Sequence, residues 1–213
     1  MDVLHMKPIK NLYAKRPNMI VGLGAQHGFS LLEVLISIII LSFGLLGMVG
    51  LQAAAIQANR DARLQSSALG LARELAEMMR GNKDIALLTS GNPYIGNFTS
   101  PLAAASPSYC LNMASGTTRC ASTTAIANAQ MTEWLARVDA ELPGARVKVC
   151  ADSQPFVNGL PTWTCTTTGT GVTTVIKIGW TRGSTDRSQT GDNAFERATV
   201  PTIVIPVTPG NTV

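Results

Sequence analysis

Histidine is confined to the start of this chain, and charged and aromatic residues are scarce along all of it. The two histidines are His5 and His27. Charged residues account for 14% of the 213 positions and aromatic residues for 5%, while Gly, Ala, Ser and Thr are abundant. This composition is typical of an exported, loop-rich protein and unlike that of a cytosolic enzyme. If the first 28 residues are removed, no imidazole remains for a Ser-His or Cys-His nucleophile pair or for a histidine-ligated metal.

Positive charge is in short supply as well. The formal net charge is +4, but Lys7, Lys10, Lys15 and Arg16 against Asp2 place +3 of it in the first 28 residues, which leaves about +1 for the rest. A bulk basic surface for nucleic acid needs a larger excess, so the composition argues against nucleic-acid binding outside a small local patch. Signatures of a catalytic nucleophile or a phosphate-binding loop are also missing. We therefore expect no enzymatic activity, no cofactor and no small-molecule substrate.

One long apolar run stands out against this background. No charged residue occurs from 34 to 59, and residues 34–51 are mainly Ile, Leu, Val, Met and Phe. About 20 such residues form a helix that crosses a hydrocarbon core of about 30 Å. Several basic residues precede the run. After it, the charges of Arg60 and Arg63 are partly balanced by Asp61. The excess of positive charge before the run predicts a cytoplasmic amino terminus by the positive-inside rule.

A single carboxylate, Glu33, stands at the start of the apolar run. A charge there costs about 2.5 to 3.5 kcal/mol near the bilayer centre and less toward its edge, so Glu33 either lies at the headgroup level or has a function. The sequence GFSLLEVLI at positions 28–36 resembles the class III signal of type IV prepilins. The matching features are a Gly before the cut, a Phe after it, a Glu five residues into the product and then an apolar helix.

The resemblance implies a role for three residues. A membrane aspartyl peptidase is expected to cut between Gly28 and Phe29 and to methylate the new amino terminus on Phe29. Glu33 is then expected to pair with the charged amino group of Phe29 on a neighbouring subunit. The leader of 28 residues is longer than many leaders of this kind, and His27 stands where Lys or Arg is common.

An ordinary secretory signal peptide is the alternative for this segment. Ala53, Ala54 and Ala55 follow the apolar run and mimic a small-residue cleavage site. The hydrophobic region would be about 18 residues long, above the usual range of about 7 to 15, and the preceding Glu33 would have no explanation.

The helix is predicted to continue beyond the bilayer. Apolar residues recur at spacings of four and three, which marks one face of a helix, and they are Leu64, Ala68, Leu71, Leu75 and Met78. Gly81 and Asn82 predict its end. We therefore divide the chain into a cleaved leader (1–28), a transmembrane half-helix (29–51), an amphipathic half-helix (52–81) and a periplasmic globular domain (82–213).

The globular part is predicted to join a second helix to an antiparallel sheet. Residues 82–123 indicate an irregular connection, and Thr124 to Leu142 a helix. Four strand-like runs follow, at Arg146 to Ala151, Trp163 to Thr167, Val172 to Arg182 and Arg197 to Ile205. The third run places Ile176, Ile178 and Trp180 on one side, the polar segment Gly183 to Asn193 joins the last two runs as a hairpin loop, and Pro201 indicates an edge position for the last one.

This order of elements resembles the pilin architecture. We expect an α+β pilin fold in which a long amino-terminal helix packs on a four-stranded antiparallel sheet. Three stretches resemble the PilV minor pilins in particular, and they are Trp134 to Gly144, Val147 to Cys150 and Ile178 to Trp180.

The four cysteines allow three pairings. Cys110 with Cys120 and Cys150 with Cys165 close the smallest loops, and an oxidising periplasm favours disulfides. A zinc site is the alternative, but no two of these cysteines are two to four residues apart and no histidine remains to assist, so we expect no metal. In many major pilins a disulfide brackets the carboxy-terminal loop, and no cysteine after Cys165 can do so here, which favours a minor subunit.

Three functions are consistent with the sequence. The resemblance implies a minor pilin that takes part in initiating pilus assembly at the inner membrane and is incorporated at or near the pilus tip. Its expected partners are the prepilin peptidase, other minor pilins, the major pilin, the assembly platform in the inner membrane and a tip adhesin. A type II secretion pseudopilin would share the same leader, and a membrane-anchored periplasmic binding domain or hydrolase outside any filament belongs to a different class.

The mature protein should begin at Phe29, and Gly28→Glu should leave the precursor uncut because a bulky charged side chain obstructs the approach of a protease to the backbone. Amino-terminal sequencing of the wild-type protein and the electrophoretic mobility of the variant measure this. A mature terminus at Ile56, or an unchanged mobility shift in the Gly28→Glu strain, would contradict the prediction.

Overall fold

The computed structural model describes residues 28–112, 119–184 and 188–210, and they belong to two compact units. The first unit ends at Gly50 and the second begins at Leu51. Helix α1, Leu31–Gly81, begins in the first unit and ends in the second. Most of the expected leader, including His27, lies outside the described residues.

Helix α1 changes character along its 51 residues. In its apolar half, the hydroxyls of Ser37 and Ser42 each donate a 2.7 Å hydrogen bond to the carbonyl four residues earlier, so neither is left unsatisfied among apolar neighbours. In its second half the buried residues are Ala68, Leu71, Ala72, Leu75, Ala76 and Met79, which share one face. The predicted long helix and its end at Gly81 are confirmed.

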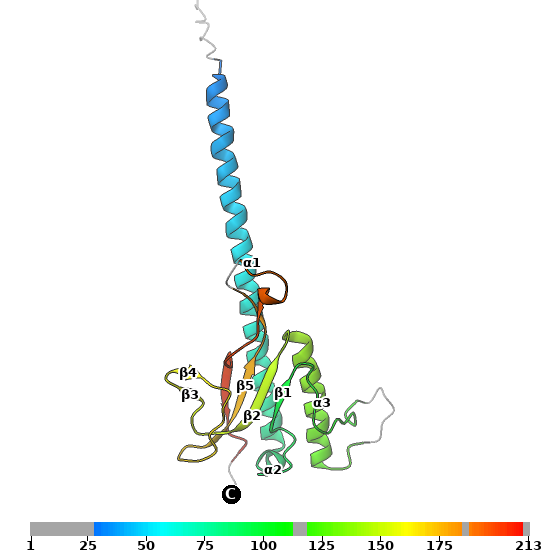
Figure 1. Cartoon of the computed structure of the whole chain (residues 1–213). Helices are drawn as coiled ribbons and strands as arrows, with labels where there is room; N and C mark the ends of the chain where they lie inside the picture. The colour runs from blue at the N-terminus through cyan, green and yellow to red at the C-terminus, as the bar shows by residue number, and fades with distance from the viewer. Residues whose placement is uncertain (1–27, 113–118, 185–187, 211–213) are drawn as a thin grey trace, which may run out of the picture. The chain divides into compact units, whose positions relative to one another are not determined.

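A four-stranded antiparallel sheet covers that face (Figure 1). Its order is β1-β2-β5-β8, and the strands are β1 (Gly96–Thr99), β2 (Arg146–Asp152), β5 (Thr173–Gly179) and β8 (Ile203–Val207). Val147 and Val149 of β2 and Ile176 and Ile178 of β5 join the hydrophobic core with α1. The expected α+β fold with a long helix and a four-stranded antiparallel sheet is confirmed.

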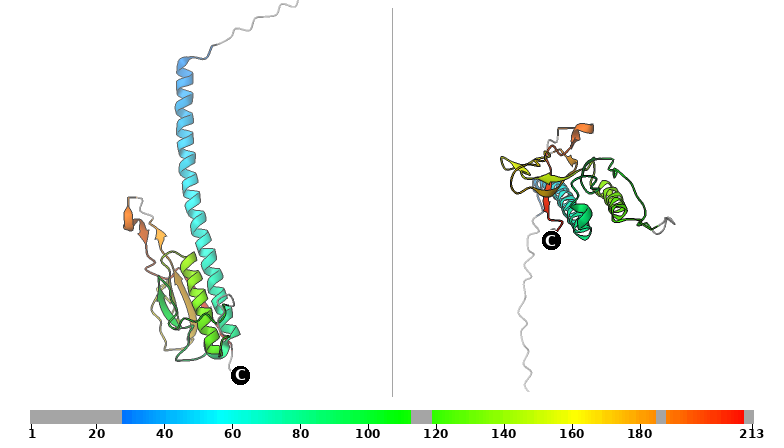
Figure 2. Two further views of the ribbon diagram at one scale, coloured as in Figure 1. Left: turned by 90° about the vertical axis from the view of Figure 1, so that its right-hand side faces the viewer. Right: turned by 90° about the horizontal axis from the view of Figure 1, so that it is seen from below.

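Helix α3, Thr123–Glu141, packs beside the second half of α1 (Figure 2). Its start is capped by the hydroxyl of Ser122, which accepts a 3.1 Å hydrogen bond from the backbone N–H of Ala125. The buried indole of Trp134 donates a 2.9 Å hydrogen bond to the carbonyl of Leu71 in α1, so the two helices are joined by a polar contact inside an apolar interface.

The predicted irregular connection at 82–123 is partly wrong. It contains a short helix, α2 (Lys83–Ala86), and the edge strand β1, which pairs with β2 from Gly96↔Val149 to Thr99↔Arg146. Strand β1 has four residues, and only Phe98 among them is buried. So short a segment shows no alternation of apolar and polar residues by which a strand could be predicted. This strand is therefore specified by its pairing with β2 and not by its own sequence.

Two of the predicted strands need correction. Trp163 to Thr167 forms no strand, and the last strand begins at Ile203 instead of Arg197, although its predicted edge position is confirmed. The hairpin before it is confirmed as well, because β6 (Arg182–Gly183) pairs with β7 (Phe195–Glu196) after the short 3-10 helix η2 (Gly191–Ala194). Part of that loop, 185–187, lies outside the described residues.

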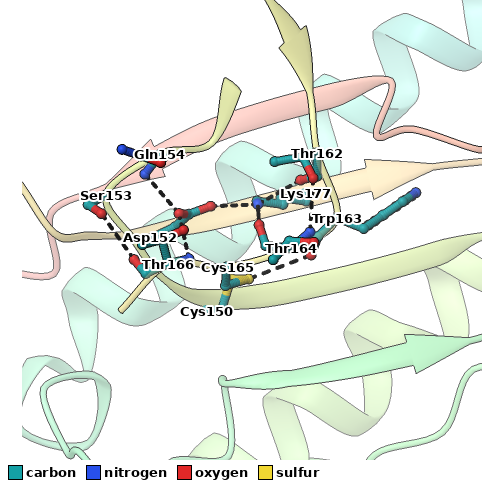
Figure 3. Close-up of a disulfide and its surroundings, with 10 residues drawn as sticks. All are labelled: Cys150, Asp152, Ser153, Gln154, Thr162, Trp163, Thr164, Cys165, Thr166 and Lys177. Carbon is teal, nitrogen blue, oxygen red and sulfur yellow. Dashed lines mark hydrogen bonds and ion pairs between the residues drawn. A yellow bond between two sulfur atoms is a disulfide. The ribbon is translucent and has the colours of Figure 1, made fainter. Parts of the chain in front are cut away.

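The segment 153–172, here called the strap, lies on the face of the sheet opposite α1 (Figure 3). It contains a small hairpin of β3 (Phe156–Val157) and β4 (Leu160–Pro161). The side chain of Lys177 in β5 is fully buried beneath it, and its Nζ donates 2.7 Å hydrogen bonds to the carbonyls of Thr162 and Thr164. These two carbonyls accept hydrogen bonds from Lys177 and are not available for pairing with a neighbouring strand. The strand predicted at Trp163 to Thr167 therefore does not form.

The third partner of Lys177 is Asp152, whose Oδ2 lies 2.6 Å from Nζ. The other oxygen accepts 2.9 Å hydrogen bonds from the backbone N–H groups of Gln154 and Thr166. Burial alone would raise the pKa of Asp152, but the hydrogen bonds from Lys177 and these two N–H groups outweigh it and lower the pKa below its ordinary value of 3.8. The stability that this carboxylate contributes is thus present above about pH 4 and is lost as the pH falls through the lowered value.

We predict that Asp152→Asn and Lys177→Met each lower the free energy of unfolding by about 3 to 5 kcal/mol, because each leaves a buried group without its partner. The double variant should lose clearly less than the sum of the two, since no charge remains to be compensated. Denaturant unfolding of all variants measures these values. As a control, Glu77→Gln breaks the exposed pair with Arg80 and should cost less than about 1 kcal/mol. Additive losses in the double variant would show that the pair is not coupled.

Candidate assembly interface

The candidate site begins with the three residues before α1. Gly28, Phe29 and Ser30 precede the helix and are exposed. The carbonyl of Ser30 accepts hydrogen bonds from the backbone N–H of Glu33 at 2.9 Å and of Val34 at 3.2 Å, so the helical ladder begins at Ser30. This geometry places Glu33 in the first turn of α1.

The carboxylate of Glu33 is exposed and forms no ion pair with any residue that the structure describes. An acid in the first turn interacts favourably with the helix dipole, by about 0.3 to 1 kcal/mol at an exposed position. Placing the charge near a bilayer centre costs about 2.5 to 3.5 kcal/mol. At the start of the apolar run the cost is smaller, and a cationic partner from outside the described residues would offset what the dipole leaves of it.

The surface of α1 around Glu33 is apolar and uncovered. The large apolar side chains from Phe29 to Leu51 are between 46% and 85% exposed. Helix α1 is long and apolar enough to cross a membrane, and none of its most apolar stretch is buried by the described residues. This stretch is therefore not part of the hydrophobic core, which α1 joins through its second half, and its surface is suited to contact with lipid or other helices.

Three glycines create room for such contacts on α1. Gly44, Gly47 and Gly50 follow each other at intervals of three residues, and a side chain added at any of them would meet nothing within 4 Å. Small residues at this spacing let the backbones of two membrane helices come close together. The described part of the chain offers no such partner at these positions.

The four cysteines belong to the second unit and form two disulfides, Cys110 with Cys120 and Cys150 with Cys165. Ligand atoms of Cys150, Cys165 and Asp152 lie within 4.8 Å of one another, which is the spacing of a metal site. The residues do not fit a metal, because the two sulfurs are bonded to each other and Asp152 is occupied by Lys177. The disulfide and the ion pair hold the strap on the sheet (Figure 3).

Sequence reasoning missed the ion pair of Asp152 and Lys177. The two residues are 25 positions apart in the sequence, and an acid and a base in alternating strands normally face solvent. The strap itself contains no charged residue, so its sequence did not indicate that it would cover this ion pair. By contrast, Gly28, Phe29 and Glu33 form a local motif that can be identified from the sequence. The structure shows in addition that Glu33 is exposed and forms no ion pair with a described residue.

Comparison with known proteins identifies one feature of this chain. The family model for the prokaryotic N-terminal methylation motif matches residues 23–49, which include Gly28, Phe29, Glu33 and most of the apolar run. No curated protein and no solved structure matches the chain. The matched segment supports a type IV pilin or pseudopilin that is processed by a prepilin peptidase and assembles with pilus components. It says nothing of the globular unit.

Proposed function

We propose that this chain is a minor pilin that takes part in initiating type IV pilus assembly and is incorporated at or near the pilus tip. The observation that carries the proposal is the exposed Glu33 carboxylate, which begins an uncovered apolar helix and has no ion pair among the residues described. Packing against similar helices would both cover this apolar surface and bring a cation to the carboxylate. The three stretches that resemble PilV minor pilins favour that type within the superfamily.

Cleavage between Gly28 and Phe29 supplies the missing cation. In the precursor the nitrogen of Phe29 is part of a peptide bond and carries no charge, and cleavage turns it into an ammonium group. Methylation of an amine keeps its positive charge. The new terminus lies four residues before Glu33, so each mature subunit carries a cation and an anion about one helical turn apart.

Pairs of subunits can then satisfy both charges within lipid. The ammonium of one subunit approaches the Glu33 carboxylate of its neighbour, and the same contact is repeated between each subunit and the next. The apolar side chains that are exposed in the single chain become the contact between neighbouring helices. The carboxylate therefore sets the axial register of the helices, because any other register leaves a charge unpaired in the membrane.

The remaining elements of the proposal follow from this arrangement. The anchor stays in the inner membrane with a cytoplasmic amino terminus, the globular unit is periplasmic, and the assembled protein is carried to the cell surface in the pilus. Partners are the prepilin peptidase, other minor pilins, the major pilin, the inner-membrane assembly platform and a tip adhesin. Both disulfides of the described chain lie before the last strand, which supports a minor rather than a major subunit.

Deletion of the gene and a pull-down distinguish this function from two others, a type II secretion pseudopilin and a membrane-anchored binding domain. Deletion of the gene should abolish twitching motility if the protein primes a pilus. Loss of enzyme export with normal motility would instead identify a pseudopilin of a type II secretion system. A protein that stays monomeric in the membrane and pulls down no minor pilin would be a membrane-anchored binding domain.

We predict that Glu33→Ala lowers the amount of this protein in the sheared pilus fraction by about tenfold or more, since the loss of a pairing worth about 1.4 kcal/mol gives a factor of ten. The folding of the globular unit should not change. Immunoblotting of pilus and membrane fractions measures incorporation, and thermal unfolding of the detergent-solubilised protein measures folding.

Glu133→Ala is the matched control, because it removes an exposed carboxylate from α3 in the second unit. It should leave incorporation within about twofold of the wild-type value, as expected for a surface substitution. Equal incorporation of Glu33→Ala and Glu133→Ala would contradict the proposed pairing.

A further inference from the structure

A pocket of about 290 Å³ lies on the strap side of the sheet, at the end where β2 begins. Thr99, Arg146 and Gly179 occupy one row across β1, β2 and β5, since Thr99 pairs with Arg146 and Arg146 with Gly179. All three line the pocket, and so do Ser100 and Arg197. These residues alternate with core residues along their strands, so they belong to the face that points away from α1.

Arg146, which lines this pocket, contacts an aromatic ring of the strap. Its guanidinium lies over the ring of Trp163 in the strap, with Cζ 4.4 Å from the ring centroid. Its Nε is buried and has no hydrogen-bond partner, and Arg146 forms no ion pair within the described part of the chain. A stacked guanidinium keeps its planar fork of donors in one orientation, and a partly desolvated cation without a counter-charge is costly.

The second cation at the pocket is Arg197, and its position depends on the close contact of Ala198 with Gly179. A side chain at this position would lie 2.8 Å from Cβ of Ala198 and 2.9 Å from the ring of Trp163. Only glycine lets both groups come this close to the sheet. The approach of Ala198 places Arg197 on the pocket wall, where it is exposed and also forms no ion pair with a described residue.

The charges around the pocket are mostly positive. Lys148 follows Arg146 on the same face of β2, about 6.7 Å further along the strand. Asp152 on this face is already neutralised by Lys177. Two other carboxylates are engaged in hydrogen bonds. Asp139 accepts a 2.7 Å hydrogen bond from Ser100, and Glu196, which precedes Arg197, accepts a 2.8 Å hydrogen bond from Ser184. Two arginines and the hydroxyl-bearing Thr99 thus line one small space in which none of the described acidic residues takes part.

We propose that this pocket binds a phosphate-type oxyanion. Arg146 and Arg197 supply planar donor groups that match a tetrahedral oxyanion bidentately, and the hydroxyl of Thr99 can donate to one of its remaining oxygens. The volume of about 290 Å³ has room for such a group. The anion has two possible sources of the same chemistry, a free phosphate or a phosphodiester of single-stranded DNA. The site does not depend on the proposed function, because it lies entirely in the globular unit.

The test is a titration of the full chain in a neutral maltoside detergent with inorganic phosphate, followed by calorimetry, at an ionic strength kept constant with chloride. We expect a dissociation constant in the millimolar range that weakens by at least about tenfold in Arg197→Gln, as loss of a charge-assisted hydrogen bond predicts. Arg197 is exposed, so this variant should fold normally, and its melting temperature without phosphate verifies that. Arg146→Gln should weaken binding at least as much.

Arg119→Gln is the matched control, because Arg119 is exposed and lies outside the pocket. It should change phosphate binding by less than about twofold. A short single-stranded oligonucleotide that displaces phosphate, with the same dependence on Arg197, identifies the phosphodiester as the ligand. Phosphate binding without such displacement identifies a free oxyanion. No binding of phosphate, or equal weakening by Arg119→Gln and Arg197→Gln, would overturn the proposal.

Discussion

The constraint on which this account depends is the cost of one carboxylate in an apolar environment. Glu33 lies in the first turn of a helix whose most apolar stretch is not buried by any described residue, and the helix dipole offsets only part of the cost of a charge in lipid. A cation placed beside such a group stabilises it. The described residues form no ion pair with Glu33, and we propose that the cation is created by processing or comes from another subunit.

The chain solves the same physical problem in a second way within its globular unit. Lys177 is also a buried charge, but its partners are Asp152 and two carbonyls of the strap, so it is satisfied entirely within the unit. The pair and the disulfide of Cys150 and Cys165 fix the strap on the sheet and leave the opposite face for α1 and α3. The charge of Lys177 is thus satisfied within the globular unit, whereas that of Glu33 has no ion pair among the described residues.

The sequence predicted those elements that carry their own local pattern. Helices α1 and α3 show a helical period, and β2 and β5 contain alternating or continuous apolar residues, so all four lie close to their expected bounds. Strand β1 has one buried residue and exists through its partner β2, and Trp163 to Thr167 was expected as a strand because the carbonyl contacts with Lys177 cannot be seen in the sequence. The motif of Gly28, Phe29 and Glu33 is local and could be identified, whereas the pocket of Arg146 and Arg197 depends on contacts between distant segments.

The most direct measurement of the central claim is zero-length cross-linking of membranes with a lipid-soluble carbodiimide, followed by mass spectrometry of the Glu33 peptide. This reagent joins a carboxylate to an amine only when the two groups are in contact. The account predicts an amide bond between the Glu33 side chain and the amino-terminal residue of another pilin subunit. Recovery of Glu33 only in unlinked form, or linked only within its own chain, would contradict it.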